Sequence, residues 1–166
     1  MEQTHKCTLP SKAIDLAGDD DNLYVLNMAK EIQVYGASDL AKGKTHKLNF
    51  EPTCVAFVAA TQHLWIGDKK GPVHVLKADD FSEVHKFEKH TKNVTVIAAS
   101  ADGTKVATGD NHRYFYIHDA ASFEMQATHC HHKDKIFDLS FSEDASKLVA
   151  CAHDGSFSVV DVVANK

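Results

Sequence analysis

Four segments of 14 residues align with one another without a gap, and this repeat restricts the possible folds more than any single motif does. Their starts lie 41, 42 and 42 residues apart. Each segment has a short apolar run, a polar turn and a second run in which apolar and polar residues alternate, which is the pattern of a tight β-hairpin. The sequence therefore predicts one hairpin per repeat. The four hairpins are Leu23–Gly36, Leu64–Lys77, Val106–Asp119 and Leu148–Asp161.

We expect an apolar inner strand before each hairpin and a more polar outer strand after each of the first three. The expected inner strands are residues 13–16, 54–57, 94–97 and 136–141, and the outer strands are residues 45–50, 84–87 and 125–129. Four strands per unit, at a period of about 40 to 45 residues, is the spacing of β-propeller blades. The sequence therefore predicts an all-β chain in which residues 1–166 form one propeller segment of four four-stranded blades. The approximate bounds of the blades are 11–50, 51–90, 91–132 and 133–166, with residues 4–9 as a closing strand.

These repeats resemble the WD-repeat β-propeller family, in which the 14-residue segment ends in Trp-Asp. In this chain the two closing positions are Tyr35-Gly36, Leu76-Lys77, His118-Asp119 and Val160-Asp161. Asp154 matches the family's aspartate in the hairpin turn, and the family's Gly-His step before the inner strand is matched only in its histidine. The resemblance implies half a propeller or part of a larger ring. It also implies structural roles for five repeat positions: His90, His132, Asp154, Asp119 and Asp161.

Residues His129-Cys130-His131-His132 place three imidazoles and a thiol in four consecutive positions. Three interpretations are open: a metal site, a catalytic Cys/His pair, or a structural part of the repeat. Zinc needs three or four ligands that converge on one point, whereas neighbours on an extended strand point to opposite faces. A metal site would therefore need a ligand from another strand, such as Cys151 or His153.

The places of two histidines in the repeat favour the structural interpretation. His132 lies seven residues before Leu139, and His90 lies seven residues before Ile97, so both precede an inner strand by the same distance. We therefore expect these histidines to tie their loops to their blades by hydrogen bonds. No metal and no other cofactor is expected.

Charge and composition give no sign of an enzyme or of a nucleic-acid or membrane partner. The net charge is −5 and the 18 Lys and Arg residues are scattered, so no basic patch is formed. No apolar run approaches the roughly 20 residues that span a bilayer. No GxSxG, HExxH or paired-carboxylate motif is present. The four cysteines, Cys7, Cys54, Cys130 and Cys151, match neither a metal knuckle nor a disulfide framework. These features predict a reduced, cytoplasmic, non-enzymatic protein.

Within the WD-repeat family, residues 50–162 are similar to the second propeller of the actin-interacting protein 1 branch, whose members are cofactors of cofilin. The likeness rests on the blade from residue 50 to residue 75 and on residues 94–122 followed by residues 131–136. It implies a scaffold that binds actin and cofilin, promotes filament disassembly and lies at the cytoskeleton, although no individual binding residue matches. The alternatives are a subunit of another cytosolic assembly, such as a ubiquitin-ligase receptor or a trafficking coat, and a His/Cys metal-binding module.

The last unit has an inner strand and a hairpin but no outer strand, whereas residues 4–9 repeat residues 45–48 at a spacing of 41. The sequence therefore predicts that residues 4–9 form an outer strand, although no hairpin precedes them to complete a blade. We expect a two-fold homodimer in which two four-blade arcs form one eight-bladed ring, and residues 4–9 of each copy pair beside residues 155–163 of the other. The alternative is that further blades of a longer protein cover the ends.

Overall fold

A computed structural model of the chain describes residues 6–162, and within this range it contains fifteen β-strands and no helix. The strands form four antiparallel sheets in chain order, and these are the propeller blades that the repeat predicts. Sheet 1 contains β1 (Ala13–Gly18), β2 (Asn22–Asn27), β3 (Glu31–Gly36) and β4 (Lys42–Lys47). Sheet 2 contains β5 (Pro52–Val58), β6 (His63–Asp68), β7 (Val73–Lys77) and β8 (Glu83–Phe87). Sheet 3 contains β9 (Val94–Ala99), β10 (Lys105–Asp110), β11 (Phe115–Asp119) and β12 (Met125–His129). Sheet 4 contains β13 (Ile136–Phe141), β14 (Lys147–Ala152) and β15 (Phe157–Asp161).

The four predicted hairpins are confirmed, and they share one backbone feature at their turns. The eighth residue of each 14-residue segment has a positive φ, of 62° to 115°. Such a conformation favours glycine, and glycine occupies this position in two of the four turns, the others having Lys30 and Arg113. The common turn geometry explains why the four segments align without a gap. The four residues are Lys30, Gly71, Arg113 and Gly155.

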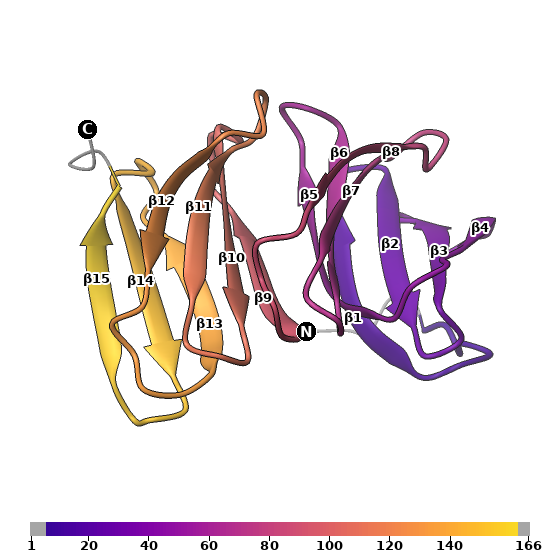
Figure 1. The fold of residues 1–166 in the computed structure, drawn as a ribbon. Coiled ribbons are helices and arrows are strands. Elements are labelled where there is room, and N and C mark those ends of the chain that lie inside the picture. Colours follow the sequence, from indigo (N-terminus) through magenta and orange to yellow (C-terminus); the bar gives the residue numbers. More distant parts are fainter. Residues whose placement is uncertain (1–5, 163–166) are drawn as a thin grey trace.

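The sheets stand side by side in an arc, with sheet 1 and sheet 4 at opposite ends (Figure 1). The inner strands β1, β5, β9 and β13 contact one another in this order along the inside of the arc. Each inner strand has a register shift at its first residues, and a bulge of this kind turns one side chain away from the regular alternation. The bulged residues are Ile14, Thr53, Thr95 and Phe137.

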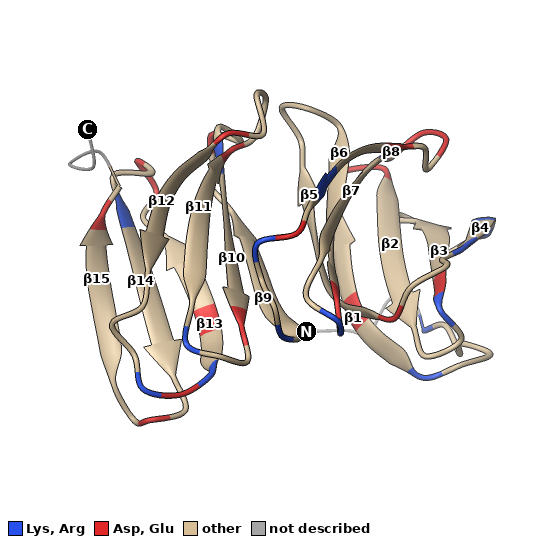
Figure 2. Ribbon diagram, in the orientation of Figure 1, with Lys and Arg blue, Asp and Glu red and all other residues tan. Residues whose placement is uncertain are grey.

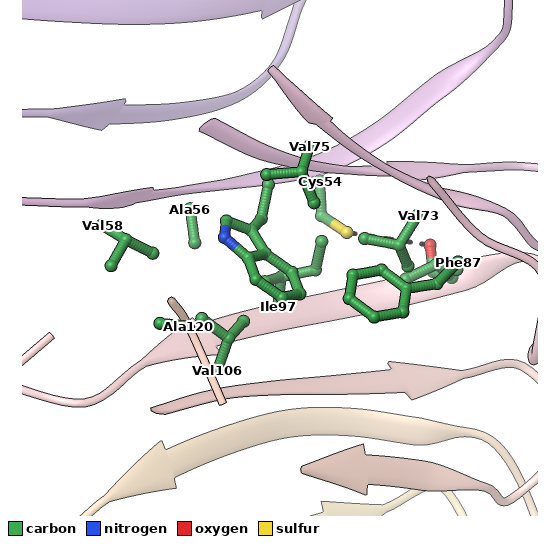
Figure 3. Close-up of a cluster of buried hydrophobic side chains, with 11 residues drawn as sticks. Cys54, Ala56, Val58, Val73, Val75, Phe87, Ile97, Val106 and Ala120 are labelled. Carbon is green, nitrogen blue, oxygen red and sulfur yellow. Dashed lines mark hydrogen bonds between the residues drawn. The ribbon is translucent and has the colours of Figure 1, made fainter. Parts of the chain in front are cut away.

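Three apolar clusters hold the sheets together, one at each joint between neighbours. Numbered within the 14-residue segment, one sheet contributes positions 2, 10 and 12. The next sheet presents positions 1, 3 and 13 at the first and third joints and position 1 at the second. Between sheets 2 and 3, for example, Trp65, Val73 and Val75 share a cluster with Val106. Figure 3 shows this cluster. Between sheets 3 and 4, Phe115 and Ile117 pack against Leu148 and Ala150. The hydrophobic cores of this chain therefore lie between sheets, which is the general arrangement in stacked repeats.

One expectation needs correction, because sheet 4 has three strands and not four. Residues 6–9 form no strand, and residues 4 and 5 of the expected closing strand lie outside the described residues. The physical reason is that an outer strand needs the free edge of β15, and the segment at residues 6–9 lies against sheet 1 instead, with Cys7 beside Tyr35. In the described part of the chain no helix is long and apolar enough to cross a membrane.

Candidate functional site

The four hairpin turns lie at the same edge of the four sheets. This edge is the candidate interaction surface, and we call it the hairpin rim. The turns β2–β3, β6–β7, β10–β11 and β14–β15 lie at this end together with the starts of the inner strands, because each hairpin pairs its turn end with those residues. The pairs are Ala13 with Asn27, Pro52 with Asp68, Val94 with Asp110 and Ile136 with Ala152. The loops that lead into the inner strands, including the two histidine loops, end here as well.

A buried hydrogen-bond chain fixes the loop before β9. His90 Nδ1 lies 2.9 Å from Asp110 Oδ2, and His90 Nε2 lies 2.8 Å from Thr108 Oγ1. Thr108 Oγ1 in turn lies 3.2 Å from His118 Nε2. The ring of Tyr116 packs edge-on against His90 at 4.5 Å. The sequence pointed to His90 but missed its partners, which are residues of β10 and β11.

The carboxylate fixes the first hydrogen bond of this chain. An ionised Asp110 only accepts, so His90 Nδ1–H donates to it. With a neutral His90, Thr108 Oγ1–H donates to His90 Nε2 and His118 Nε2–H donates to Thr108. Burial by itself raises the pKa of Asp110, but the hydrogen bond from His90 and those from the His112 and Tyr114 amides lower it more. Burial, followed by the nearby His90 and His85, lowers the pKa of His118 to about 3. With this lowered pKa, His118 is neutral near pH 7.

The loop before β13 uses serine where the preceding loop uses an aspartate and a threonine. His132 Nδ1 and Nε2 lie 2.9 Å from Ser156 Oγ and Ser158 Oγ, respectively. Asp154 does not contact the imidazole. Its carboxylate accepts the Lys133 amide at 2.7 Å and also the amide of Ser156 at 2.9 Å. His132 and Asp154 thus hold the same loop through different atoms.

The two remaining repeat positions lie at the opposite end of the sheets. Asp119 accepts the amides of Ala121 and Ser122, at 3.0 and 2.8 Å, and so closes the turn after β11. Asp161 forms an exposed ion pair with Lys147 at 2.6 Å. Exposed pairs of this kind contribute little to stability. The structure therefore gives the five repeat positions separate roles and does not bring them together as one site.

A second buried histidine, His74 in sheet 2, was not predicted. His74 Nδ1 lies 2.6 Å from Glu83 Oε2, and its Nε2 lies 3.8 Å from Asp68 Oδ2. The ring of Phe50 stacks on His74 at 3.7 Å and 4°. His74 occupies position 11 of its segment, where the other repeats have Gln33, Tyr116 and Ser158. Because the position varies in this way, the repeat alone gave no signal for it.

The four residues of the His129–His132 cluster do not converge. His129 is half-buried and stacks on Phe115 at 4.8 Å, Cys130 and His131 are exposed, and His132 is buried. Of the proposed extra ligands, His153 Nδ1 instead lies 3.1 Å from Asp134 Oδ2. Across residues 6–162 no group of three or more His, Cys, Asp and Glu residues is placed to hold a metal ion.

A groove of about 360 Å³ runs along the inside of the arc at the hairpin rim, where the bulged residues of the inner strands meet. Thr53 Oγ1 donates to the Val94 carbonyl and Thr95 Oγ1 donates to the Ile136 carbonyl, both at 2.6 Å, so each threonine bridges to the next inner strand. At the two ends of the arc the bulged residues are apolar and exposed, namely Ile14 and Phe137.

Charge around this groove is mixed. Lys135 lines the groove, and its Nζ lies 4.7 Å from the ring centroid of Phe137. Acidic and basic segments occur at both ends of the sheets, and no continuous basic stripe is visible on the side shown in Figure 2. The groove therefore offers an aromatic ring, a cation and apolar side chains, and no arrangement of nucleophile and base.

Comparison with known proteins identifies the type of repeat. The family model for the WD domain, G-beta repeat matches residues 81–119 and 123–161, just under half of the chain. Each match begins near an outer strand and ends with the hairpin of the following sheet. Two relatives are named as WD-repeat proteins. An uncharacterized WD repeat-containing protein of Schizosaccharomyces pombe is 30% identical over 80 residues, which are 48% of this chain and 15% of that protein.

WD repeat-containing protein JIP5 of Cryptococcus neoformans is 36% identical over 61 residues, which are 37% of this chain and 16% of that protein. U3 small nucleolar RNA-interacting protein 2 of Homo sapiens is 27% identical over 132 residues, which are 73% of this chain and 27% of that protein. The chain thus spans less than a third of the length of each relative. Together these matches support the WD40 repeat family for this chain.

Two solved structures of computationally designed proteins share the fold. The designed Ika4 protein has a TM-score of 0.81 and 21% identity, over 97% of this chain and 99% of that chain. The designed Ika8 protein has a TM-score of 0.77 and 21% identity, over 90% of this chain and 45% of that chain. At this identity the likeness concerns the fold alone. The arc of four sheets therefore corresponds to a whole chain in one case and to part of a longer chain in the other.

Proposed function

We propose that the chain is a non-enzymatic scaffold that binds a protein partner in the groove at the hairpin rim. The observation that carries the proposal is the pair of exposed apolar residues, Ile14 and Phe137, at the ends of a groove whose walls are fixed by the Thr53 and Thr95 bridges. A groove built on rigid strands can bind without reorganisation. WD repeats, the type of repeat matched here, support an interaction role.

The chemistry of the groove selects the kind of partner. Phe137 and Ile14 suit an apolar side chain, and Lys135 suits a carboxylate next to it. We infer that the partner presents an extended segment in which an apolar residue adjoins an acidic one. Nucleic acid is not proposed, because the lysines of the rim are interspersed with carboxylates such as Asp134 and Asp154.

A peptide of defined chemistry tests this proposal. A fluorescein-labelled peptide of alternating Glu and Leu should bind the chain, and its anisotropy change should weaken when salt is raised. A peptide of alternating Lys and Leu is the control. The double variant Phe137→Ala with Lys135→Glu should weaken binding at least ten-fold, whereas Met28→Ala, an exposed residue in a hairpin turn, should leave it unchanged. Equal binding of both peptides, or binding unaffected by the double variant, would contradict the proposal.

Actin and cofilin are the partners that the sequence resemblance over residues 50–162 favours. Co-sedimentation with filamentous actin, with and without cofilin, tests them directly. Pelleting of the chain with filaments, increased by cofilin and reduced by the groove variant, is the expected result. A chain that stays in the supernatant under both conditions would exclude this pair.

Other binding partners are compatible with the same scaffold. A ubiquitin-ligase receptor or a trafficking coat uses a propeller as a docking unit, and the human relative is named for its interaction with U3 small nucleolar RNA. We propose the cytoplasm as the location, because the four cysteines are free thiols, which suits a reducing compartment. A fluorescent fusion that accumulates in the nucleolus would instead favour a client like that of the human relative.

A further inference from the structure

Three apolar positions of the repeat are buried between neighbouring sheets in sheets 1 to 3. The same three positions are exposed in sheet 4. Positions 2, 10 and 12 are Val149, Phe157 and Val159, and all three side chains are exposed, Phe157 at 75% and Val159 at 55%. At position 10 the other sheets have Ile32, Val73 and Phe115, each at most 1% exposed. An apolar face of this kind in solvent marks an interaction site. The repeat adds that its natural cover is another sheet of the same type.

The hydrogen bonds of Asp138 in β13 also indicate that another sheet of this type packs next to sheet 4. In sheet 1, Asp15 accepts the Leu16 amide through Oδ1 at 2.9 Å, and its Oδ2 accepts the Val55 amide from the inner strand of sheet 2 at 2.8 Å. Asp138 is the equivalent residue of β13, and its Oδ1 accepts the Leu139 amide at the same 2.9 Å. Among residues 6–162 its Oδ2 has no hydrogen-bond partner. Asp138 is therefore arranged to receive an amide from a following inner strand.

Sheet 1 presents the complementary face at the other end of the arc. Positions 1 and 3, Leu23 and Val25, are only half-buried, and Leu16 beside them is 63% exposed. At the joints between sheets 1 and 2 and between sheets 3 and 4, positions 1 and 3 of one sheet meet positions 2, 10 and 12 of the sheet before it. Between sheets 2 and 3 the cluster contains position 1 of sheet 3, Val106. The free face of sheet 1 is thus the type of face on which sheet 4 should pack.

The segment before β1 lies where an outer strand of a preceding sheet belongs. Leu48, just after β4, packs in the cluster that contains Leu76, position 13 of sheet 2. Cys7 stands 41 residues before Leu48 and lies against Tyr35, position 13 of sheet 1. Burial, and next to it the Cys7 thiol, raise the pKa of Tyr35. The segment has the place of an outer strand but has no third strand to pair with, and β15 has a free edge.

We propose that two copies of the chain associate head to tail and close a ring of eight sheets. The free face of sheet 4 in each copy packs on sheet 1 of the other, and the segment around residues 6–9 pairs with the edge of β15. The register of β3 with β4, Glu31 opposite Lys47, places Lys6 opposite Ser156 of the other copy. The two joints are equivalent by a two-fold axis, so no apolar sheet face stays free.

We favour a second copy of this chain as the partner of these faces, because one chain carries the two complementary faces of a joint, one on sheet 4 and one on sheet 1. The association joins the ends of the arc, where Ile14 and Phe137 of the groove also lie. It rests on the free sheet faces and not on binding in the groove, so it does not depend on the proposed function.

Sedimentation velocity of the 166-residue chain over a range of concentrations tests the proposal. We expect a species of twice the chain mass. Phe157→Glu and Leu16→Glu, one on each face, should each weaken association at least 100-fold, because both joints then bury a charge. Met28→Glu is the matched control, an equally exposed apolar residue outside both faces, and should leave association unchanged. Circular dichroism of all variants at low concentration checks that each is folded.

An equimolar mixture of the Phe157→Glu and Leu16→Glu variants separates this arrangement from other dimers. One joint of the mixed pair contains only unaltered faces, so the mixture should associate more tightly than either variant alone. A monomer at all concentrations would overturn the proposal, as would a ladder of larger oligomers or a mixture no tighter than its components.

Discussion

The buried chain of hydrogen bonds around His90 gives the most specific stability prediction. His90→Ala removes the bond to the Asp110 carboxylate and the bond to Thr108, in a site where both side chains of the His90–Asp110 pair are 2% exposed. A hydrogen bond to a charged group contributes about 1.5 to 3 kcal/mol and a neutral one about 1 kcal/mol. Asp110 keeps the His112 and Tyr114 amides, which limits the penalty for its buried charge. We expect a loss of about 3 kcal/mol in the free energy of unfolding.

Urea unfolding at fixed protein concentration measures this loss, and thermal unfolding should show it as a fall in Tm of roughly 6 to 12 °C, given about 2 to 4 °C per kcal/mol at this chain length. His112→Ala is the control, since His112 is an exposed histidine on the same rim, and should change stability by less than about 0.5 kcal/mol. The double variant with Asp110→Asn should show a coupling energy of about 1 to 3 kcal/mol with His90→Ala. If His90→Ala were no more destabilising than His112→Ala, the structural role of the network would be refuted.

Three further predictions follow from the same contacts. His132→Ala should cost only about 1 kcal/mol in urea unfolding, because its Ser156 and Ser158 partners are neutral hydroxyls; a loss larger than that of His90→Ala would contradict this. The pKa of His118 is about 3 in the folded chain and 6.5 unfolded, so its contribution is complete above pH 6.5 and is lost as pH falls towards 3. Between pH 7 and pH 5 the free energy of unfolding should therefore drop by about 2 kcal/mol, and the drop should shrink in His118→Phe; a flat profile would exclude the effect. Purified, dialysed protein should contain no stoichiometric zinc by elemental analysis, because the His129–His132 side chains do not converge; one zinc per chain would revive the metal interpretation.

Much of the architecture could be predicted because its signals are local. Alternation of apolar and polar residues and the polar turns specify the hairpins, and the period of 41 to 42 residues specifies how many there are. The offsets of His90 and His132 placed them in the loops before the inner strands, and both do bond to their sheets. These properties depend on neighbours along the chain, so no knowledge of the packing was needed.

The candidate site was less predictable, since its partners come from different strands or sheets. Asp110 and Thr108 face His90 from β10, about 20 residues away, and no spacing rule identifies them. Phe50 lies in the loop before β5 but stacks on His74 of β7. The groove exists only because the bulges of four inner strands turn Ile14, Thr53, Thr95 and Phe137 towards the same line.

Phe115 and Phe157 illustrate which properties the sequence determines and which the tertiary structure decides. Both occupy position 10 of their segments, and the sequence by itself determined that each lies in the third strand of its blade. Only the tertiary structure decided that Phe115 is fully buried and Phe157 is 75% exposed. The physical reason is that hairpin formation uses contacts within about 14 residues, whereas burial of a propeller face requires a neighbouring sheet. Sheet 4 supplies that neighbour for Phe115, and within the arc no sheet supplies one for Phe157.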